Sequence, residues 1–329
     1  MIKTSAPGKV VLSGEYAVLN GAPAICMAVN RRATVSLHSI SEEYHQVTAP
    51  GHVEEPRRFL VRDGVFGWLD SSDEFELLEQ VWRAAKVDLE GGLELRLDTS
   101  MFLDSVSGSK TGIGSSAALS VALAYALHEL DPGKADPLQV AHEGHLRFQG
   151  GLGSGVDIAT SAAGELVKYR MSDRSVTNLT LPKGLECRLF WSGSPASTGK
   201  KLERLSSHGP QPSQEALAYS ARRMADAWQS GSANSVLDEY REYIRVLQEF
   251  SDDHGLDVFG TGHRELAALA QGAGLVYKPC GAGGGDIGIL LADDSQRADV
   301  FVQESLPEGF KVLDLDIDRQ GVTVTREPQ

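Results

Sequence analysis

The chain has 329 residues, of which 41% are hydrophobic and 23% charged, so its composition excludes a disordered or fibrous protein. This length favours two domains over one compact core. With 31 Lys and Arg against 45 Asp and Glu, the net charge of −14 argues against a general nucleic-acid binder or a polybasic membrane-surface protein. A small anionic substrate stays possible, because a few local Lys and Arg residues can bind phosphate within an acidic protein.

The cysteines and the N-terminal residues indicate the compartment. Cys26, Cys187 and Cys280 are widely separated and contain no CxxC pair, so we expect reduced thiols, no disulfide framework and no cysteine zinc site. The first residues lack the basic-then-apolar order of a signal peptide, and no window of eighteen residues is apolar throughout. We therefore expect a soluble, cytoplasmic protein with no membrane partner.

Strand-like and helix-like segments alternate along the first half of the chain. Apolar alternation predicts strands at residues 9–19, 33–37 and 93–97, and the polar, proline-interrupted residues 41–64 predict an exposed hairpin or loop. Helical spacing predicts helices at residues 75–85, 117–130, 139–148 and 156–163. Segments rich in glycine and serine, residues 105–116 and 150–155, directly precede two of these helices.

The second half follows the same alternation. We expect strands at residues 185–191, 274–278 and 286–291, and helices at residues 215–229, 234–250, 262–271 and 295–305, with two further strands near the end. Residues 206–213, with Pro210 and Pro212, are the best candidate linker. The pattern predicts an α+β fold of two domains, residues 1–185 and 186–329.

The first glycine-rich segment of chemical interest is residues 110–117, which we call the phosphate loop. Gly112 and Gly114 free the backbone so that consecutive N–H groups can point at one centre, and the following helix adds its positive N-terminal dipole. Ser115 and Ser116 offer hydroxyls to a phosphate or to its Mg²⁺. The alternative is a flexible turn with Ser115 as an ordinary N-cap. The segment is neither a GxxxxGK[ST] loop nor a dinucleotide-binding fingerprint.

Two further segments combine glycines with an acidic residue. Residues 149–157 end in Asp157 before an apolar helix, where the carboxylate either caps the helix or accepts a proton from an attacking hydroxyl. Residues 281–285, which we call the glycine loop, contain four glycines between two strands and are followed by Asp286. Four glycines exceed what a hairpin needs and permit close approach of a ligand or of the phosphate loop.

Taken in order, these segments resemble the GHMP small-molecule kinases. Residues 5–19 (SAPGKVVLSGEYAVL) resemble the N-terminal signature of that family, residues 112–118 its phosphate loop, and residues 281–286 its C-terminal glycine motif. Within the family, the resemblance is closest to the phosphomevalonate kinase branch. It rests on the segments GEY at 14–16, KTGIGSS at 110–116, HLRFQG at 145–150, GSGVD at 153–157 and WSGSPAST at 191–198. The chain is short for that branch.

The resemblance implies a fold and a set of roles. The N-terminal domain would be like ribosomal protein S5 domain 2 and the C-terminal domain ferredoxin-like, with ATP and substrate in the cleft between them. Asp157 matches the catalytic aspartate of the family and Lys9 a lysine near the reacting groups, where it would keep that carboxylate ionised and stabilise the charge of phosphoryl transfer. Ser116 matches the serine near Mg²⁺. Contacts with ATP are expected from Lys110, Gly112, Gly114, Ser115, Ser116 and Ala117.

The resemblance specifies the acceptor and the second metal contact less closely. Substrate contacts are expected from Glu15, Tyr16, Ser154, Ser194, Ser197, Thr198, Lys200 and Gly283. The basic candidates for a substrate phosphate are Lys110, Lys200, Lys201, Arg31, Arg32 and Arg147, each with the alternative of an ordinary surface charge. His145 stands where mevalonate kinases carry a metal-binding glutamate, and we expect it to be a neutral core or hydrogen-bonding residue.

These features lead to the expectation of an ATP- and Mg²⁺-dependent kinase that converts 5-phosphomevalonate into 5-diphosphomevalonate in the mevalonate pathway of isoprenoid biosynthesis. A mevalonate kinase is the main alternative. A diphosphomevalonate decarboxylase is less consistent with the GEY and GSGVD segments, and a non-catalytic sensor would not need Lys9, Ser116 and Asp157 together. We expect a monomer or homodimer that binds small molecules and no nucleic acid.

Overall fold

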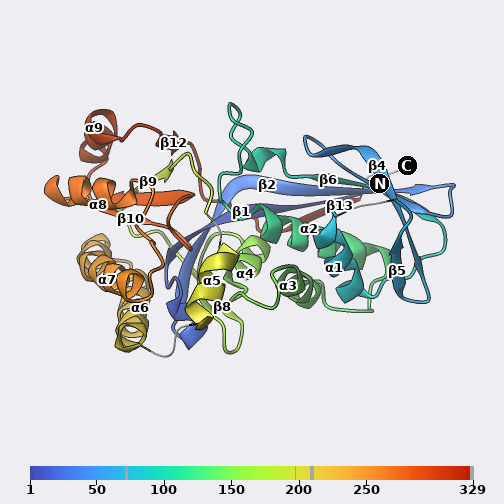
Figure 1. Ribbon diagram of the computed structural model, residues 1–329, viewed down its shortest axis with the longest axis horizontal. Coiled ribbons are helices and arrows are strands. Elements are labelled where there is room, and N and C mark those ends of the chain that lie inside the picture. The colour runs from blue at the N-terminus through green and yellow to red at the C-terminus, as the bar shows by residue number, and fades with distance from the viewer. Residues whose placement is uncertain (71–72, 197, 208–210, 327–329) are drawn as a thin grey trace.

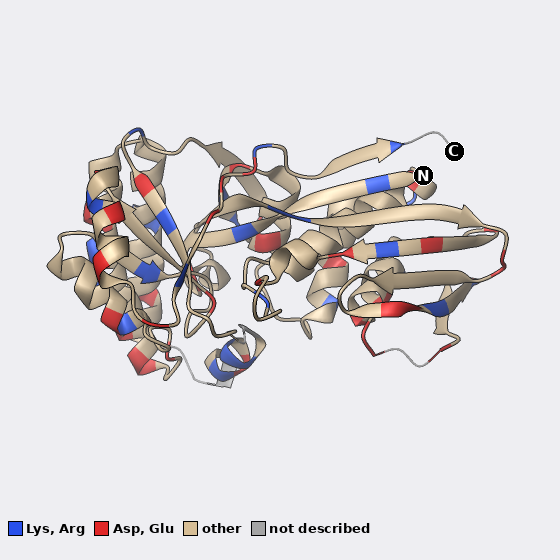
Figure 2. Ribbon diagram, turned by 90° about the horizontal axis from the view of Figure 1, so that it is seen from above, with Lys and Arg blue, Asp and Glu red and all other residues tan. Residues whose placement is uncertain are grey.

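The structure is a computed structural model that describes residues 1–70, 73–196, 198–207 and 211–326. Figures 1 and 2 show, from two directions at right angles, an elongated molecule with a large sheet at one end and a smaller, helix-covered sheet at the other. The strands are β1 (Ile2–Ser13), β2 (Ala24–Ile40), β3 (His45–Ala49), β4 (Val53–Arg62), β5 (Val65–Trp68), β6 (Gly92–Asp98), β7 (Leu166–Arg170), β8 (Ser175–Leu179), β9 (Glu186–Trp191), β10 (Val276–Pro279), β11 (Ile287–Ala292), β12 (Lys311–Leu313) and β13 (Thr323–Arg326).

The helices cover both sheets. The α-helices are α1 (Glu76–Ala85), α2 (Ser115–Leu130), α3 (Pro137–Phe148), α4 (Val156–Ala163), α5 (Thr198–Ser207), α6 (Pro212–Ser230), α7 (Ala233–Asp253), α8 (His263–Gly272) and α9 (Ser295–Ser305). Two short 3-10 helices are η1 (Ala17–Asn20) and η2 (Ser100–Phe102). Within the described ranges, no helix combines the length and the apolar character that crossing a bilayer requires.

The large sheet has the strand order β13-β1-β2-β6-β3-β4-β5, and β7 pairs with β2 and with β8. The long strand β2 pairs with β7 through its first residues and with β6 through its last. Helices α1 to α4 lie together on one face of this sheet (Figure 1). The side chains of Phe59, Trp82 and Leu127 are buried between them in a core that excludes water from this face.

The smaller sheet has the order β10-β11-β9-β12, with α8 and α9 on one face and α6 and α7 on the other (Figure 1). A second core continues from this sheet into the first half of the chain. It contains Leu12 and Ile25 of the large sheet as well as Trp191 and Tyr240 of the second half. The two halves therefore share one apolar interior, and the cavity described below lies where they meet.

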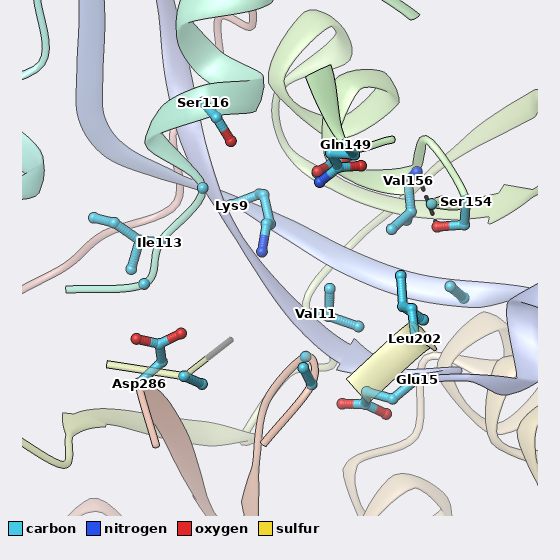
Figure 3. A pocket seen from close by; sticks show the side chains of 18 of the residues that line it. Lys9, Val11, Glu15, Ile113, Ser116, Gln149, Ser154, Val156, Leu202 and Asp286 are labelled. Carbon is cyan, nitrogen blue, oxygen red and sulfur yellow. Dashed lines mark hydrogen bonds between the residues drawn. The ribbon is translucent and has the colours of Figure 1, made fainter. Parts of the chain in front are cut away.

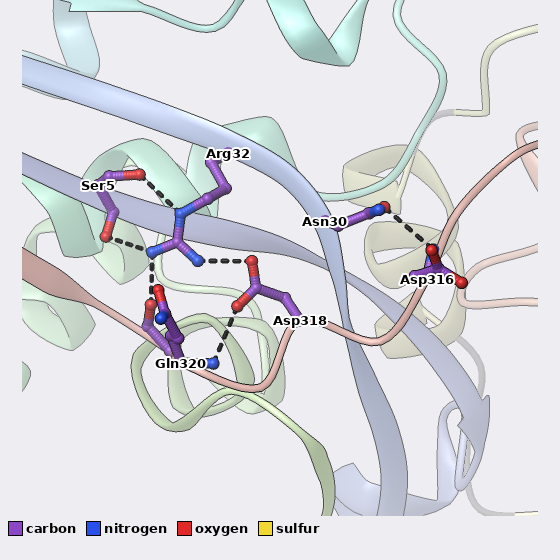
Figure 4. A network of polar contacts seen from close by, with 7 residues as sticks. Ser5, Asn30, Arg32, Asp316, Asp318 and Gln320 are labelled. Carbon is purple, nitrogen blue, oxygen red and sulfur yellow. Dashed lines mark hydrogen bonds and ion pairs between the residues drawn. The ribbon is translucent and has the colours of Figure 1, made fainter.

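The last described residues return to the large sheet. Strand β13 pairs with β1, and the segment that leads to it is held by Arg32 (Figure 4). The Arg32 guanidinium donates to Ser5 Oγ at 2.7 Å and to Gly321 O at 2.6 Å, and it forms an ion pair with Asp318. Arg31 donates to Asp314 O at 3.1 Å. Both arginines therefore bind the returning chain, and neither lines the cavity, so the structure does not bring either of these candidates for a substrate phosphate to the site.

Most of the helices and strands predicted from the sequence are present, with a few differences. The strand expected at residues 9–19 ends at Ser13, because Gly14 and Tyr16 take left-handed φ values of 89° and 59° that turn the chain into η1. Residues 41–64 form the β3–β4 hairpin. The β7–β8 hairpin, β5 and α5 are additions. Of the expected linker 206–213, residues 208–210 lie outside the described residues. The sheets change between β8 and β9, near the division at 185/186, which stays a prediction since β13 rejoins the first sheet.

Candidate active site

A cavity of about 370 Å³ opens where the two halves of the molecule meet. One wall is formed by β1, the phosphate loop and the start of α4, and the opposite wall by the glycine loop and Asp286 (Figure 3). Pro195 and Ala196 also line the cavity. The structure brings together these predicted site residues at the cavity: Lys9, Glu15, Tyr16, Lys110, Gly112, Gly114, Ser115, Ser116, Ser154 and Asp157. Segments that are far apart in the sequence thus converge on one site.

The first turn of α2, which directly follows the glycines of the phosphate loop, lies at the cavity and has no capping side chain. Helix α2 begins at Ser115, Gly114 occupies the N-cap position, and no side chain caps the helix. The alternative with Ser115 as the N-cap is therefore wrong, and the first-turn N–H groups lack the side-chain acceptor that usually satisfies them. Such a helix start, with its positive dipole, is suited to bind an anion.

Because Gly114 has no side chain, the side chain of Lys9 can pass close to the backbone of the phosphate loop. A Cβ at position 114 would lie 2.8 Å from Lys9 Cε, and the backbone there has a left-handed φ of 83°. The Lys9 amide donates to Ile113 O at 2.8 Å, which fixes β1 against the loop. Figure 3 shows the Lys9 side chain extending into the middle of the pocket. Its ammonium group is thereby placed next to the helix start that would hold an anion.

Of the other predicted loop residues, Lys110 is exposed and lines the cavity, whereas Ala117 does not. Ala117 is fully buried and packs in the core between the helices and the large sheet. The Ala117 side chain therefore points into the core, and the predicted contact of Ala117 with ATP stays a prediction.

Asp157 lies in the first turn of α4 and lines the cavity. Gly155 is the N-cap residue, so the alternative in which Asp157 caps the helix is wrong. Burial raises the pKa of the Asp157 carboxyl, but the nearby His145 and Lys9 and the Ile158 amide outweigh burial and leave that pKa below its usual value. Asp157 is therefore ionised at neutral pH.

His145 of α3 links Ser116 to Asp157. Its Nε2 lies 3.1 Å from Ser116 Oγ, and its Nδ1 lies 3.8 Å from Asp157 Oδ2. Burial lowers the pKa of His145, more than the carboxylate of Asp157 raises it, so the imidazole is neutral and the close approach is no ion pair. This confirms the expectation of a neutral, hydrogen-bonded histidine.

The charge on Asp157 assigns the tautomer of His145. A proton on Nδ1 faces the carboxylate favourably, whereas a bare Nδ1 would place a lone pair against it. With the proton on Nδ1, Nε2 accepts a hydrogen bond from the Ser116 hydroxyl. The lone pairs of Ser116 Oγ are then left for a partner in the cavity, which suits the predicted place of Ser116 near a metal ion.

Glu15 and Tyr16 line the cavity, but their polar atoms already have protein partners. The carboxylate of Glu15 forms a buried ion pair with Lys278 and accepts a hydrogen bond from Tyr243 Oη at 2.7 Å. The Tyr16 hydroxyl donates to Ala282 O at 2.7 Å. These contacts join the first half of the chain to α7, β10 and the glycine loop. They give both residues an anchoring role, and their predicted contact with substrate stays a prediction.

Most of the remaining predicted substrate residues that the structure describes do not line the cavity. Ser154 lines the cavity and its Oγ accepts from the Val156 amide at 3.3 Å. Ser194, Lys200 and Gly283 do not line it, and Lys200 is exposed. Ser197 lies outside the described residues, and Thr198 is the first residue of α5. Arg147, on α3, is exposed and pairs with Glu143. The structure therefore does not bring Lys200 or Arg147 to the cavity.

Asp286 is the main cavity residue that the sequence analysis did not select. It follows the glycine loop with a left-handed φ of 53°, and its side chain lies against Gly112, where a Cβ would come within 2.3 Å of Asp286 Cγ. Burial raises the pKa of Asp286, while hydrogen bonding to the Ala196 amide and the charges of Lys9 and Lys201 oppose this rise. Its place directly after four glycines was the available signal. The structure thus shows the close approach to the phosphate loop that was one of the two alternatives for the glycine loop.

No group of three or more His, Cys, Asp or Glu side chains converges on a possible metal position within the part of the chain that the structure describes. Mg²⁺ beside a nucleotide commonly uses only one or two protein oxygens together with phosphates and water. Ser116 and Asp157, at one wall of the cavity, supply oxygens of that kind.

Comparisons with known proteins agree with this geometry. The family described as GHMP kinases N terminal domain matches residues 76–165. A phosphomevalonate kinase of Streptomyces sp. (strain CL190) is 30% identical, covering 90% of this chain and 91% of that protein. A mevalonate kinase of Pyrococcus abyssi is 28% identical, covering 90% of both chains.

Solved structures show the same fold. Streptococcus pneumoniae phosphomevalonate kinase in complex with phosphomevalonate and AMPPNP superposes with a TM-score of 0.78 at 19% identity, covering 96% of this chain and all of that one. A Lin0012 protein from Listeria innocua gives a TM-score of 0.86 at 24% identity, covering 99% of both chains. The sequence relatives and the shared fold lead to one conclusion: the chain belongs to the GHMP kinases, a family of ATP-dependent small-molecule phosphotransferases.

Proposed function

We propose that this kinase transfers the γ-phosphoryl group of ATP to 5-phosphomevalonate, giving 5-diphosphomevalonate and ADP. The observation that carries the proposal is the convergence of an uncapped helix start, the Lys9 side chain and the ionised Asp157 carboxylate on one cavity. In the reaction, an oxygen of the acceptor phosphate bonds to the γ-phosphorus, and the bond from that phosphorus to the oxygen bridging to the β-phosphate breaks. Positioning and positive charge are the main requirements of such a transfer.

The phosphate loop is the proposed site for the nucleotide phosphates. The free amides at the start of α2 would bind phosphate oxygens, and Lys110 and Lys9, which both line the cavity, would add positive charge. The Streptococcus pneumoniae relative of the same fold was solved with AMPPNP, an ATP analogue, which supports ATP as the donor. Ser115 is the first residue of α2, so its amide and hydroxyl belong to the helix start that would bind the phosphates.

The residues present fit a magnesium ion. Ser116 Oγ has lone pairs left by its hydrogen bond to His145, and Asp157 supplies an anionic oxygen on the same wall. When bound, Mg²⁺ would neutralise charge on the nucleotide phosphates. Ser116 and Asp157 are the residues proposed to hold it.

The charge state of Asp157 favours an acceptor that has already lost its proton. A general base is most effective when its pKa lies near the working pH, and the pKa of Asp157 is shifted the other way. A phosphate monoester has a second pKa near 6, so at neutral pH it offers an ionised oxygen without a base. Asp157 would then orient the acceptor and hold the charge of Lys9, which suits phosphomevalonate better than an alcohol.

Phosphorylation of mevalonate itself is the second candidate. It is supported by relatives named mevalonate kinase, such as the Pyrococcus horikoshii enzyme at 27% identity over 98% of this chain. In that reaction the acceptor is a hydroxyl, and Asp157 would have to accept its proton. The cavity offers two lysines, Lys9 and Lys110, for all the anionic groups of donor and acceptor, so the second phosphate of phosphomevalonate makes the greater demand on them.

An ADP-release assay with mevalonate, phosphomevalonate and diphosphomevalonate side by side tests the proposal. We expect kcat/KM for phosphomevalonate to exceed that for mevalonate by at least about tenfold, which is one charge-assisted contact. Release of CO₂ from diphosphomevalonate would reveal a decarboxylase. A clear preference for mevalonate would overturn the proposed acceptor while leaving the family assignment intact.

A further inference from the structure

The glycine loop is held by its carbonyl groups. Four consecutive carbonyls accept hydrogen bonds from side chains that belong to separate parts of the chain. Ala282 O accepts from Tyr16, Gly283 O from Lys201 at 2.6 Å, Gly284 O from Thr261 at 3.0 Å, and Gly285 O lies 3.1 Å from His263 Nε2. A loop of glycines is intrinsically mobile, so these contacts are what fix its backbone.

Among these side chains, Lys201 connects the loop to α5. Its Nζ also lies 3.2 Å from Ala282 O and 3.3 Å from Asp257 O. A lysine ammonium has three N–H groups, and three carbonyls surround this one. Burial lowers the pKa of Lys201, and the charges of Asp257 and Asp286 oppose the lowering. The ammonium group is therefore partly shielded from water.

Gly284 makes room for this ammonium group. A Cβ at position 284 would lie 2.3 Å from Lys201 Nζ and 2.6 Å from Asp257 O, and the backbone has a left-handed φ of 70°. Any larger residue would displace the lysine from the loop. The glycine at this position therefore fits the lysine contact as well as the turn.

The segment before α5 is joined to the same loop. The Asp286 amide donates to Ser194 O at 2.7 Å, and the Ser192 amide donates to Asp286 O at 2.9 Å. Pro195 and Ala196, which follow Ser194, line the cavity, as does Leu202, which follows Lys201 on α5. The glycine loop, residues 194–196 and α5 thus make one continuous wall opposite the phosphate loop.

We propose that Lys201 is a positioning residue, whose ammonium group fastens α5 to the glycine loop and keeps this wall of the cleft in place for the acceptor. Lys201 does not line the cavity, and its three N–H groups already have carbonyl partners. It is therefore not a ligand for an acceptor phosphate, which is the role its charge alone would suggest. The kinetic part of this proposal rests on the proposed function, but the structural part does not.

Hydrogen–deuterium exchange of the free protein tests the structural part. In Lys201→Met, which keeps the aliphatic stem, we expect the amides of residues 281–285 to exchange at least about tenfold faster, because a charge-assisted contact is lost. Lys200→Met removes the exposed neighbour on the same helix and should leave the exchange of the loop unchanged. Gly284→Ala, which would push the ammonium away, should reproduce the effect of Lys201→Met.

Kinetics separate a positioning residue from a ligand. A displaced wall should raise KM for mevalonate and for phosphomevalonate by the same factor in Lys201→Met, with a smaller change in kcat. A rise in KM confined to the phosphorylated acceptor would make Lys201 a phosphate ligand and overturn the proposal. Unchanged exchange of the loop in both Lys201→Met and Gly284→Ala would also overturn it. If neither acceptor is turned over, the proposed function fails, and the exchange measurement still decides the role of Lys201.

Discussion

The two loops that face each other across the cavity satisfy their backbone groups in opposite ways. The phosphate loop ends at the uncapped start of α2, so its amides lack side-chain partners in the protein. The glycine loop has four consecutive carbonyls bound by side chains from elsewhere in the chain. The phosphate loop therefore leaves backbone groups available for a ligand, whereas the protein itself binds those of the glycine loop. Glycine content alone therefore does not distinguish a ligand-binding loop from a scaffold.

The largest effect is expected from a larger side chain at position 114 of the phosphate loop. Gly114→Val should abolish ATP binding, because the new side chain meets Lys9 and the left-handed φ is unfavourable for valine. Isothermal titration calorimetry measures this loss of ATP affinity directly. Gly67→Val is the control, since a Cβ there meets no neighbour within 4 Å. Wild-type affinity in Gly114→Val would refute the assignment of this loop to the phosphates.

The ion pair that joins the two sides of the cleft should matter most for stability. Lys278→Met leaves Glu15 buried without its cation, and both side chains are at most 1% exposed. We expect a loss of about 3–5 kcal/mol in the free energy of unfolding, measured by urea denaturation. Lys311→Met removes a lysine that is 45% exposed and paired with Asp104, so it should cost about 1 kcal/mol or less. Equal losses in the two variants would mean that burial of the pair is unimportant.

Removing the charge of Asp157 should affect turnover and leave the fold intact. Asp157→Asn should lower kcat at least about 100-fold with little change in KM, the usual size of a base or positioning role. The variant retains the first-turn position in α4, so circular dichroism and thermal melting should match the unmodified protein. Near-normal turnover would show that the carboxylate contributes to α4 only.

The smallest effect concerns the acceptor. Lys110 is exposed at the cavity, so its ammonium remains partly hydrated. Lys110→Ala should raise KM for phosphomevalonate about tenfold, or about 1.4 kcal/mol. Lys134→Ala is the control, because Lys134 pairs with Asp131 at 3.2 Å and does not line the cavity. If both variants gave the same KM, Lys110 would have no part in binding the acceptor.

The sequence predicted those parts of the site that depend on local pattern. Glycines directly before an apolar helix predicted the phosphate loop and the position of Asp157, and both face the cavity. The partners of Glu15 could not be predicted, because Lys278 and Tyr243 are separated from it by more than 200 residues and no pattern links them. Lys200 was chosen over Lys201 for the same reason: only the helix position decides which of two adjacent lysines faces the loop.

The fold, like the site, could be predicted from the sequence only in part. Periodicity located the long helices but not the short β7–β8 hairpin or the turn after Ser13, where Gly14 and Tyr16 both have left-handed φ values. The positions of Arg31 and Arg32 in the sequence gave no sign that they bind the returning chain.

The pairing of β13 with β1 has a consequence for biosynthesis. Ile2 pairs with Arg326, so this edge of the large sheet stays open until residues 323–326 have emerged from the ribosome. An unpaired edge strand is a template for wrong pairing, and contacts between such distant residues form late. Nascent chains from which β13 has not yet emerged should therefore aggregate or bind chaperones more than those from which it has emerged.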